Sequence, residues 1–144
     1  KTSKLPEFLM HKERRTTTNI SKKSMASIYL DTNILIDLFK RDTSKLAELA
    51  EHKLYISPLS CHILCYATKT NIPTLELDLL LKNMGIVNLS NVVLQRALVG
   101  PTNDLEDNLQ LHSATQGKCQ YFLTRDKLLL KLGYFGETAI VDHL

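Results

Sequence analysis

The chain lacks the features that mark several large classes of protein. Its three cysteines are an odd number without the spacing of a disulfide framework, which favours a reduced, cytoplasmic protein. The longest apolar runs fall well short of the ~20 residues that cross a bilayer. No basic segment followed by an apolar one resembles a signal peptide. We therefore expect a cytoplasmic protein that has no membrane partner.

Familiar catalytic and cofactor motifs are missing as well. The sequence contains no glycine-rich dinucleotide fingerprint, phosphate-binding loop, nucleophile elbow or HExxH motif. Cys61, His62 and Cys65 lie close together, but no second Cys/His pair has the spacing of a zinc finger. Core cysteines are the ordinary interpretation of such residues. The chemistry has to come from other side chains.

The charge is unevenly distributed along the chain. With 144 residues, 44% of them hydrophobic, the chain suits one globular domain with a single core. Residues 1–24 hold seven Lys/Arg and two Glu, a net +5, whereas residues 25–144 have a net charge of −2. A basic segment can bind nucleic acid, or an acidic pocket of its own protein. We divide the chain into a basic leader, residues 1–24, and a domain, residues 25–144.

From residue 27 onward, short β-rich runs alternate with helical segments. Strands are expected at residues 27–30, 54–57, 86–89, 121–124 and 139–141. Helices are expected after the following capping or initiating residues: Asp31, Thr43 or Ser44, Pro58, Pro73, Ser90, Asn103 or Asp104, and Asp126. This order predicts an α/β fold, an α/β/α sandwich around a central parallel sheet of about five strands.

Acidic side chains stand where buried segments give way to polar ones. Asp31 follows SIYL, Asp126 follows YFLTR, and Glu106 and Asp107 begin a helix. Each alone is an ordinary helix cap or first-turn acid. In a parallel sheet, however, the ligand crevice lies beyond the carboxyl ends of the strands, at the switch point of strand order. Carboxylates gathered there favour a hard divalent cation, Mg²⁺ or Mn²⁺.

Three segments together resemble the motifs of PIN-domain nucleases, especially VapC-type toxins of toxin–antitoxin systems. They are YLDTNILIDLF, DLEDNLQLHSA and FLTRD, and the similarity spans residues 28–142. The resemblance implies a PIN-like nuclease domain over residues 25–144 that acts as a metal-dependent endoribonuclease with Mg²⁺ or Mn²⁺. It also implies an RNA substrate, an antitoxin partner and a homodimer.

The resemblance assigns roles to individual residues. By motif position, the catalytic and metal-binding set is Asp31, Asp107 and Asp126. Glu106 is placed at the periphery, because neighbouring helical residues point about 100° apart. The side chains that could orient these carboxylates or a water molecule are Thr32, Asn33 and Thr124.

One departure from the family pattern concerns a glutamate. PIN toxins usually carry it in a segment like S-x-x-T-x-x-E-L, and here that position falls on Ile63. The neighbouring His62 could supply a nitrogen ligand or a proton-transfer group. Fewer acids hold a cation less tightly, so the alternative interpretation is a weak or inactive PIN module that binds RNA or a protein partner.

The basic leader gains a second interpretation from the resemblance. VapC-type toxins are inhibited by an antitoxin tail, which packs a short helix in a groove and directs a basic side chain toward the acids. The leader has apolar residues at Leu5, Phe8 and Leu9 and then basic ones at Arg14 and Arg15. An arginine there could bridge carboxylates and compete with the metal. The leader is therefore either an antitoxin-like tail or a disordered extension.

Overall fold

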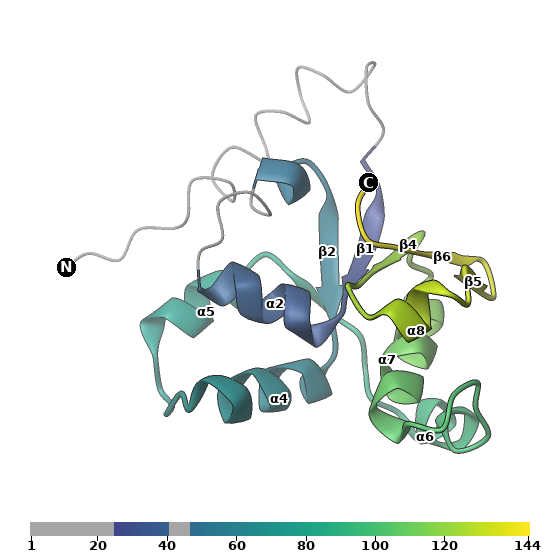
Figure 1. Cartoon of the computed structure of the whole chain (residues 1–144). Helices are drawn as coiled ribbons and strands as arrows, with labels where there is room; N and C mark the ends of the chain where they lie inside the picture. Colours follow the sequence, from purple (N-terminus) through teal and green to yellow (C-terminus); the bar gives the residue numbers. More distant parts are fainter. Residues whose placement is uncertain (1–24, 41–46) are drawn as a thin grey trace.

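A six-stranded sheet forms the middle of the computed structural model, which describes residues 25–40 and 47–144 (Figure 1). The strand order is β3-β2-β1-β4-β6-β5, and each adjacent pair is parallel except β5–β6. The strands are β1 (Ser27–Leu30), β2 (Lys53–Ile56), β3 (Gly85–Ile86), β4 (Tyr121–Leu123), β5 (Tyr134–Phe135) and β6 (Thr138–Val141). The basic leader and its proposed role lie outside the described residues.

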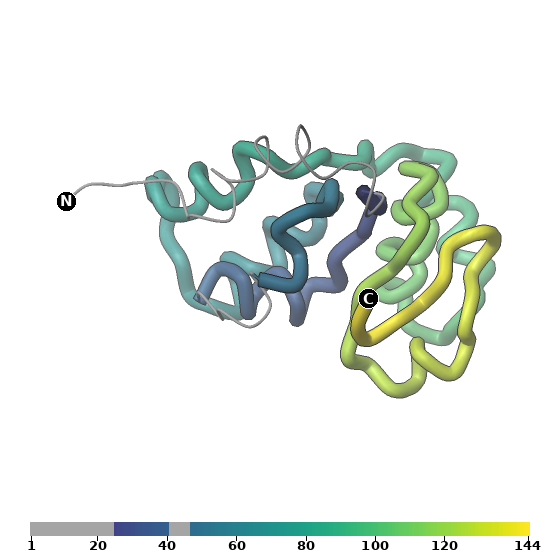
Figure 2. The backbone as a smooth tube through the Cα atoms, turned by 90° about the horizontal axis from the view of Figure 1, so that it is seen from above, coloured from purple at the N-terminus to yellow at the C-terminus, as the bar shows by residue number. Residues whose placement is uncertain are grey.

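Helices cover both faces of this sheet (Figure 1 and, seen from above, Figure 2). One face carries α2 (Thr32–Phe39), α4 (Pro58–Thr68) and α5 (Leu75–Leu81), whereas the other carries α7 (Leu105–Gln116) and α8 (Lys127–Leu130). A further helix, α6 (Asn91–Ala97), packs on α7. The predicted α/β/α sandwich is thereby confirmed. No helix in the described part of the chain is long and apolar enough to span a membrane.

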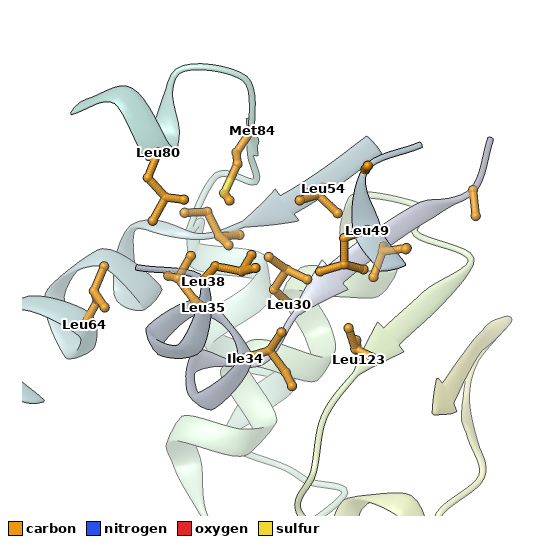
Figure 3. Packing of buried hydrophobic residues seen from close by; sticks show 14 of the residues in the cluster. Leu30, Ile34, Leu35, Leu38, Leu49, Leu54, Leu64, Leu80, Met84 and Leu123 are labelled. Atoms are coloured by element: carbon orange, nitrogen blue, oxygen red, sulfur yellow. The ribbon is translucent and has the colours of Figure 1, made fainter. Parts of the chain in front are cut away.

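Strand residues supply two cores because successive side chains point to opposite faces of a sheet. Ile28 and Leu30 join the larger cluster on the α2 side, whereas Tyr29 between them joins the cluster under α7. Figure 3 shows Leu30 packed beside Leu35 of α2. Each such fully buried side chain stabilises the fold by about 1.5–3 kcal/mol. Because both faces of the sheet are buried, the ends of the strands and the residues that follow them are held in fixed positions.

The helix starts agree closely with the capping pattern, and one strand was not predicted. Asp31, Ser90, Asp104 and Asp126 each cap the expected helix with their side chains. The sheet has six strands instead of about five, because β5 pairs antiparallel with β6 across a turn at Gly136, where φ is +63°. A strand of two residues is too short to display an alternating pattern. The proposed caps of the second helix, at residues 43 and 44, lie outside the described residues.

Candidate active site

Asp31 lies where the strand order reverses, between β1 and β4. Its backbone N–H donates to the Leu123 carbonyl at 2.9 Å, and its side chain begins α2. The side chain is buried and both of its oxygens are engaged. Oδ1 accepts the backbone N–H of Thr32 at 2.8 Å, and Oδ2 accepts the hydroxyl of Thr124 at 2.6 Å. The Asp31 carboxylate is thus fixed in orientation.

Thr124 connects Asp31 to the acid that follows β4. Its hydroxyl donates to Asp31 and also accepts the backbone N–H of Asp126 at 3.0 Å. Asp126 in turn caps α8, because its Oδ1 accepts the N–H of Leu128 at 2.9 Å. Asp31 and Asp126 follow two parallel strands, as expected, and the structure shows that these strands, β1 and β4, are neighbours.

Asp107 approaches from the start of α7. The capping residue Asp104 accepts its backbone N–H at 3.0 Å, which sets the first turn of the helix. Burial raises the pKa of Asp107 to about 6, and the negative charges of Asp104, Asp31 and Asp126 add to the rise. Asp107 therefore lies within electrostatic reach of both acids at the strand ends.

The pKa values of two neighbouring acids, Asp31 and Glu106, are raised as well. Burial raises the pKa of Asp31, although the hydrogen bonds from Thr124 and Thr32 oppose that rise. Glu106 is exposed, and its pKa is raised by partial burial and then by the charges of Asp104 and Asp31. Asp31 and Asp107 are thus each repelled by neighbouring carboxylates, and such repulsion is relieved by protons or by a cation.

The oxygen donors of the site suit a magnesium ion, although the carboxylates are not placed to coordinate one together. Within residues 25–40 and 47–144, no group of three or more His, Cys, Asp or Glu side chains is arranged to hold a metal directly. Mg²⁺ keeps several of its waters and commonly binds through only one or two carboxylates. The buried Oδ1 of Asn33, two residues after Asp31 in the chain, has no hydrogen-bond partner in the described part and is a further oxygen donor. The residues present thus fit the ion in kind.

Comparison with solved structures identifies the fold. No protein-family model matches the chain, and no curated protein sequence does. A chain in the crystal structure of VapBC2 from Rickettsia felis, bound to a DNA fragment from their promoter, is 17% identical with a TM-score of 0.61, over 80% of this chain and 97% of that one. A chain of a toxin–antitoxin complex from Klebsiella pneumoniae is 23% identical with a TM-score of 0.61, over 78% and 95% respectively. This chain has a PIN-like fold.

An ion pair involving Arg125 lies next to Asp126 in the sequence of this PIN-like fold. Nη1 of Arg125 lies 2.7 Å from Oδ2 of Asp37 on α2. The charge of Arg125 also lowers the pKa of Asp31, the weakest of the influences on that carboxyl. The Arg125 side chain is 51% exposed, so the pair is a surface contact of small stabilising effect. Arg125 remains accessible to an anionic ligand at the rim of the crevice.

The position at which the PIN pattern has a glutamate lies at an apolar groove. Ile63 and His62 of α4 line a groove of about 440 Å³ whose other walls are Leu59, Tyr66, Leu105, Glu106 and Leu109. The His62 ring lies 6.5 Å from that of Tyr66, nearly parallel to it. Its proposed role as a metal or proton-transfer group stays a prediction. Ile63 contributes only apolar surface, so the structure supplies no replacement carboxylate from this turn of α4.

A buried polar network that was not predicted from the sequence lies beneath the acids of the PIN-like fold. Its centre is Gln110 of α7, which hydrogen-bonds to Thr32, Ser60 and Tyr29. A signal was present in the sequence, because Gln110 lies three residues after Asp107 and shares its side of the helix. A glutamine on the buried side of a helix requires partners. Only the fold reveals which ones.

Proposed function

We propose that the chain is a metal-dependent endoribonuclease of the PIN type and the toxin component of a toxin–antitoxin pair. One observation carries the nuclease proposal. Asp31, Asp107 and Asp126 come from three separate elements and interact electrostatically at the switch point of the sheet. Repulsion among the carboxylates of such a cluster is removed by a bound divalent cation.

The proposed roles follow from the contacts of each residue. Asp31, Asp107 and Asp126 would hold Mg²⁺ or Mn²⁺, which when bound polarises a phosphodiester and lowers the pKa of a water molecule. The Thr124 hydroxyl and the Thr32 N–H hold the Asp31 carboxylate in one orientation. Asn33 offers its unpartnered oxygen to a water molecule. Arg125, half exposed at the rim, can contact a phosphate of the RNA.

A specific observation favours the second candidate function, a PIN module that binds without cutting. Ile63 stands at the usual glutamate position, and no three acids in the described residues form a closed ligand group. A cation held by fewer charges binds more weakly. The groove lined by Ile63 and Leu109 could instead bind an apolar segment of a partner.

Cleavage assays across a titration of divalent cation distinguish the two functions. We expect the full chain to cut single-stranded or structured RNA in Mg²⁺ or Mn²⁺, to stop when EDTA is added, and to resume when Mn²⁺ is restored. The physical reason is that three unneutralised carboxylates repel the phosphate backbone. Gel analysis of a labelled RNA pool measures the cleavage. RNA that is bound but not cut at any cation concentration would support the binding module.

The partner proposals have separate grounds. The similar chains come from a complex of VapBC2 and from a toxin–antitoxin complex, which supports an antitoxin partner here. Helix α6 and its C-cap residue expose apolar side chains, with Leu94 40% and Leu98 66% exposed, and these suit a surface covered by a second copy. We propose a homodimer on this basis. Its mass in solution can be measured by light scattering.

Deleting the basic leader is expected to raise RNA cleavage by roughly tenfold. If Arg14 or Arg15 bridges the site carboxylates, each lost charge-assisted contact of about 1.5 kcal/mol corresponds to that factor. The rates of the full chain and of residues 25–144 provide the measurement. A synthetic peptide of residues 1–24 should restore inhibition, and the same peptide with Arg14→Ala and Arg15→Ala should not. Equal rates with and without the leader would argue for an extension that has no regulatory role.

A further inference from the structure

We propose that Gln110 is a positioning residue for the acidic site, which it serves by fixing Thr32 beside Asp31 and by tying α7 to β1. The inference rests on the proposed function, because positioning matters only if the carboxylates act together. Gln110 touches neither Asp31 nor Asp107 by any hydrogen bond in the described residues. It acts through the residues to which its side chain is hydrogen-bonded.

The amide nitrogen of Gln110 connects α7 to the residue that follows Asp31. Nε2 donates to the hydroxyl oxygen of Thr32 at 3.0 Å. Thr32 is the first residue of α2, and its N–H donates to Oδ1 of Asp31 at 2.8 Å. Two successive hydrogen bonds therefore lead from the middle of α7 to the carboxylate after β1. Displacing Thr32 would alter the direction in which that carboxylate points.

The amide oxygen of Gln110 links α7 to two further elements. Oε1 accepts the hydroxyl of Tyr29 on β1 and that of Ser60 on α4, the latter at 3.4 Å. Ser60 is itself held by the backbone N–H of Ser57 at 3.1 Å.

Because the hydrogen bonds of Gln110 are buried, they determine how α7 is positioned. Gln110 is only 1% exposed, and Tyr29 and Ser60 are not exposed at all. Water cannot compete for the bonds, and each is directional, whereas apolar packing between α7 and the sheet tolerates small slides. Because Asp107 is three residues earlier on the same helix, fixing Gln110 against β1 and Thr32 also fixes the position of Asp107 relative to Asp31.

A purely structural role would make the opposite prediction, namely that loss of Gln110 lowers stability and nothing else. Gln110→Met separates the two roles because it keeps the length of the side chain and removes every hydrogen bond. Leu111→Val is the matched control, since Leu111 is the next residue of α7, fully buried in the core under that helix and outside the network. Thr32→Ser and Thr32→Val form a second pair, in which the serine keeps the hydroxyl that Gln110 contacts.

The first measurement is the affinity of the full chain for Mn²⁺ by calorimetry. Gln110→Met and Thr32→Val should weaken binding roughly 10- to 100-fold, as is typical when a residue that supports a metal ligand is lost. Thr32→Ser should stay within a few-fold of the original chain. Leu111→Val should lower the unfolding temperature and leave the affinity unchanged. Unchanged affinity in Gln110→Met would overturn the proposal.

The second measurement needs no metal. In the metal-free chain, hydrogen exchange at the Thr32 amide should accelerate in Gln110→Met more than exchange at the strand amide of Asp31, which is bonded to Leu123. Equal acceleration of both would indicate lost stability alone and would reject positioning. If the original chain binds Mn²⁺ without cutting RNA, the nuclease proposal fails while affinity and exchange still decide the role of Gln110. If it binds no Mn²⁺, the exchange data decide alone.

Discussion

Replacing Asp31 by asparagine should reduce RNA cleavage by more than about 100-fold, because loss of a residue that merely supports a metal ligand already costs 10- to 100-fold. The substitution removes the charge of the most buried acid of the site and leaves its shape. The cleavage rate at saturating RNA and a fixed excess of Mn²⁺ is the quantity to compare. A rate within tenfold of the original chain would remove Asp31 from the proposed metal-binding set.

The fold should survive this substitution. The new amide oxygen can accept the N–H of Thr32, and the amide nitrogen can donate to the Thr124 hydroxyl oxygen, which has a second lone pair beside the one that Asp126 uses. An unchanged circular dichroism spectrum would therefore accompany the lost activity. Asp78→Asn is the matched control, since Asp78 is an exposed acid in the first turn of α5. It should cleave RNA at the original rate.

The order of elements could be predicted because capping residues and buried strands leave strong local signals. Asp31, Asp104 and Asp126 each accept a backbone N–H at the start of a helix, and such residues are recognisable from type and position alone. Strand β5 left no such signal, since it is held by pairing with β6 and not by its own pattern. Pairing partners depend on the whole fold.

The acidic site could be predicted only as a set of positions. Strand order brought Asp31 and Asp126 to the same edge, because parallel neighbours end on the same side of the sheet. The electrostatic coupling of Asp107 to both required the actual approach of α7. The role of Gln110 was hidden for a similar reason. Its partners Thr32 and Ser60 lie 78 and 50 residues away along the chain.

The position of Ile63 connects the site to the groove beside it. A glutamate there would add a further acid to the groove that Glu106 already lines. Glu106 already has a pKa raised by partial burial and by its acidic neighbours. An isoleucine avoids this additional repulsion and leaves the wall of the groove apolar at that position. The missing acid is expected to lower the affinity of the site for a cation.

The same reasoning predicts that Asp107→Asn stabilises the metal-free protein while abolishing cleavage. An acid with a higher pKa in the folded state binds its proton more tightly when folded. The contribution of Asp107 to stability therefore falls as pH rises from 3.8 to about 6. Such a rise corresponds to no more than about 3 kcal/mol, and solvent screening of this partly exposed group reduces it to about 1 kcal/mol.

Urea unfolding with EDTA present, at several pH values, measures this effect. The stability gain of Asp107→Asn should be absent below the ordinary pKa of 3.8, grow through about pH 6 and stay constant above it. Asp78→Asn should lose a few tenths of a kcal/mol instead, because a first-turn acid normally favours its helix. A loss at Asp107 as well would mean that the helix dipole outweighs both the burial of Asp107 and its repulsion by Asp104, Asp31 and Asp126. In that case the carboxylates would not be gathered closely enough to need a cation.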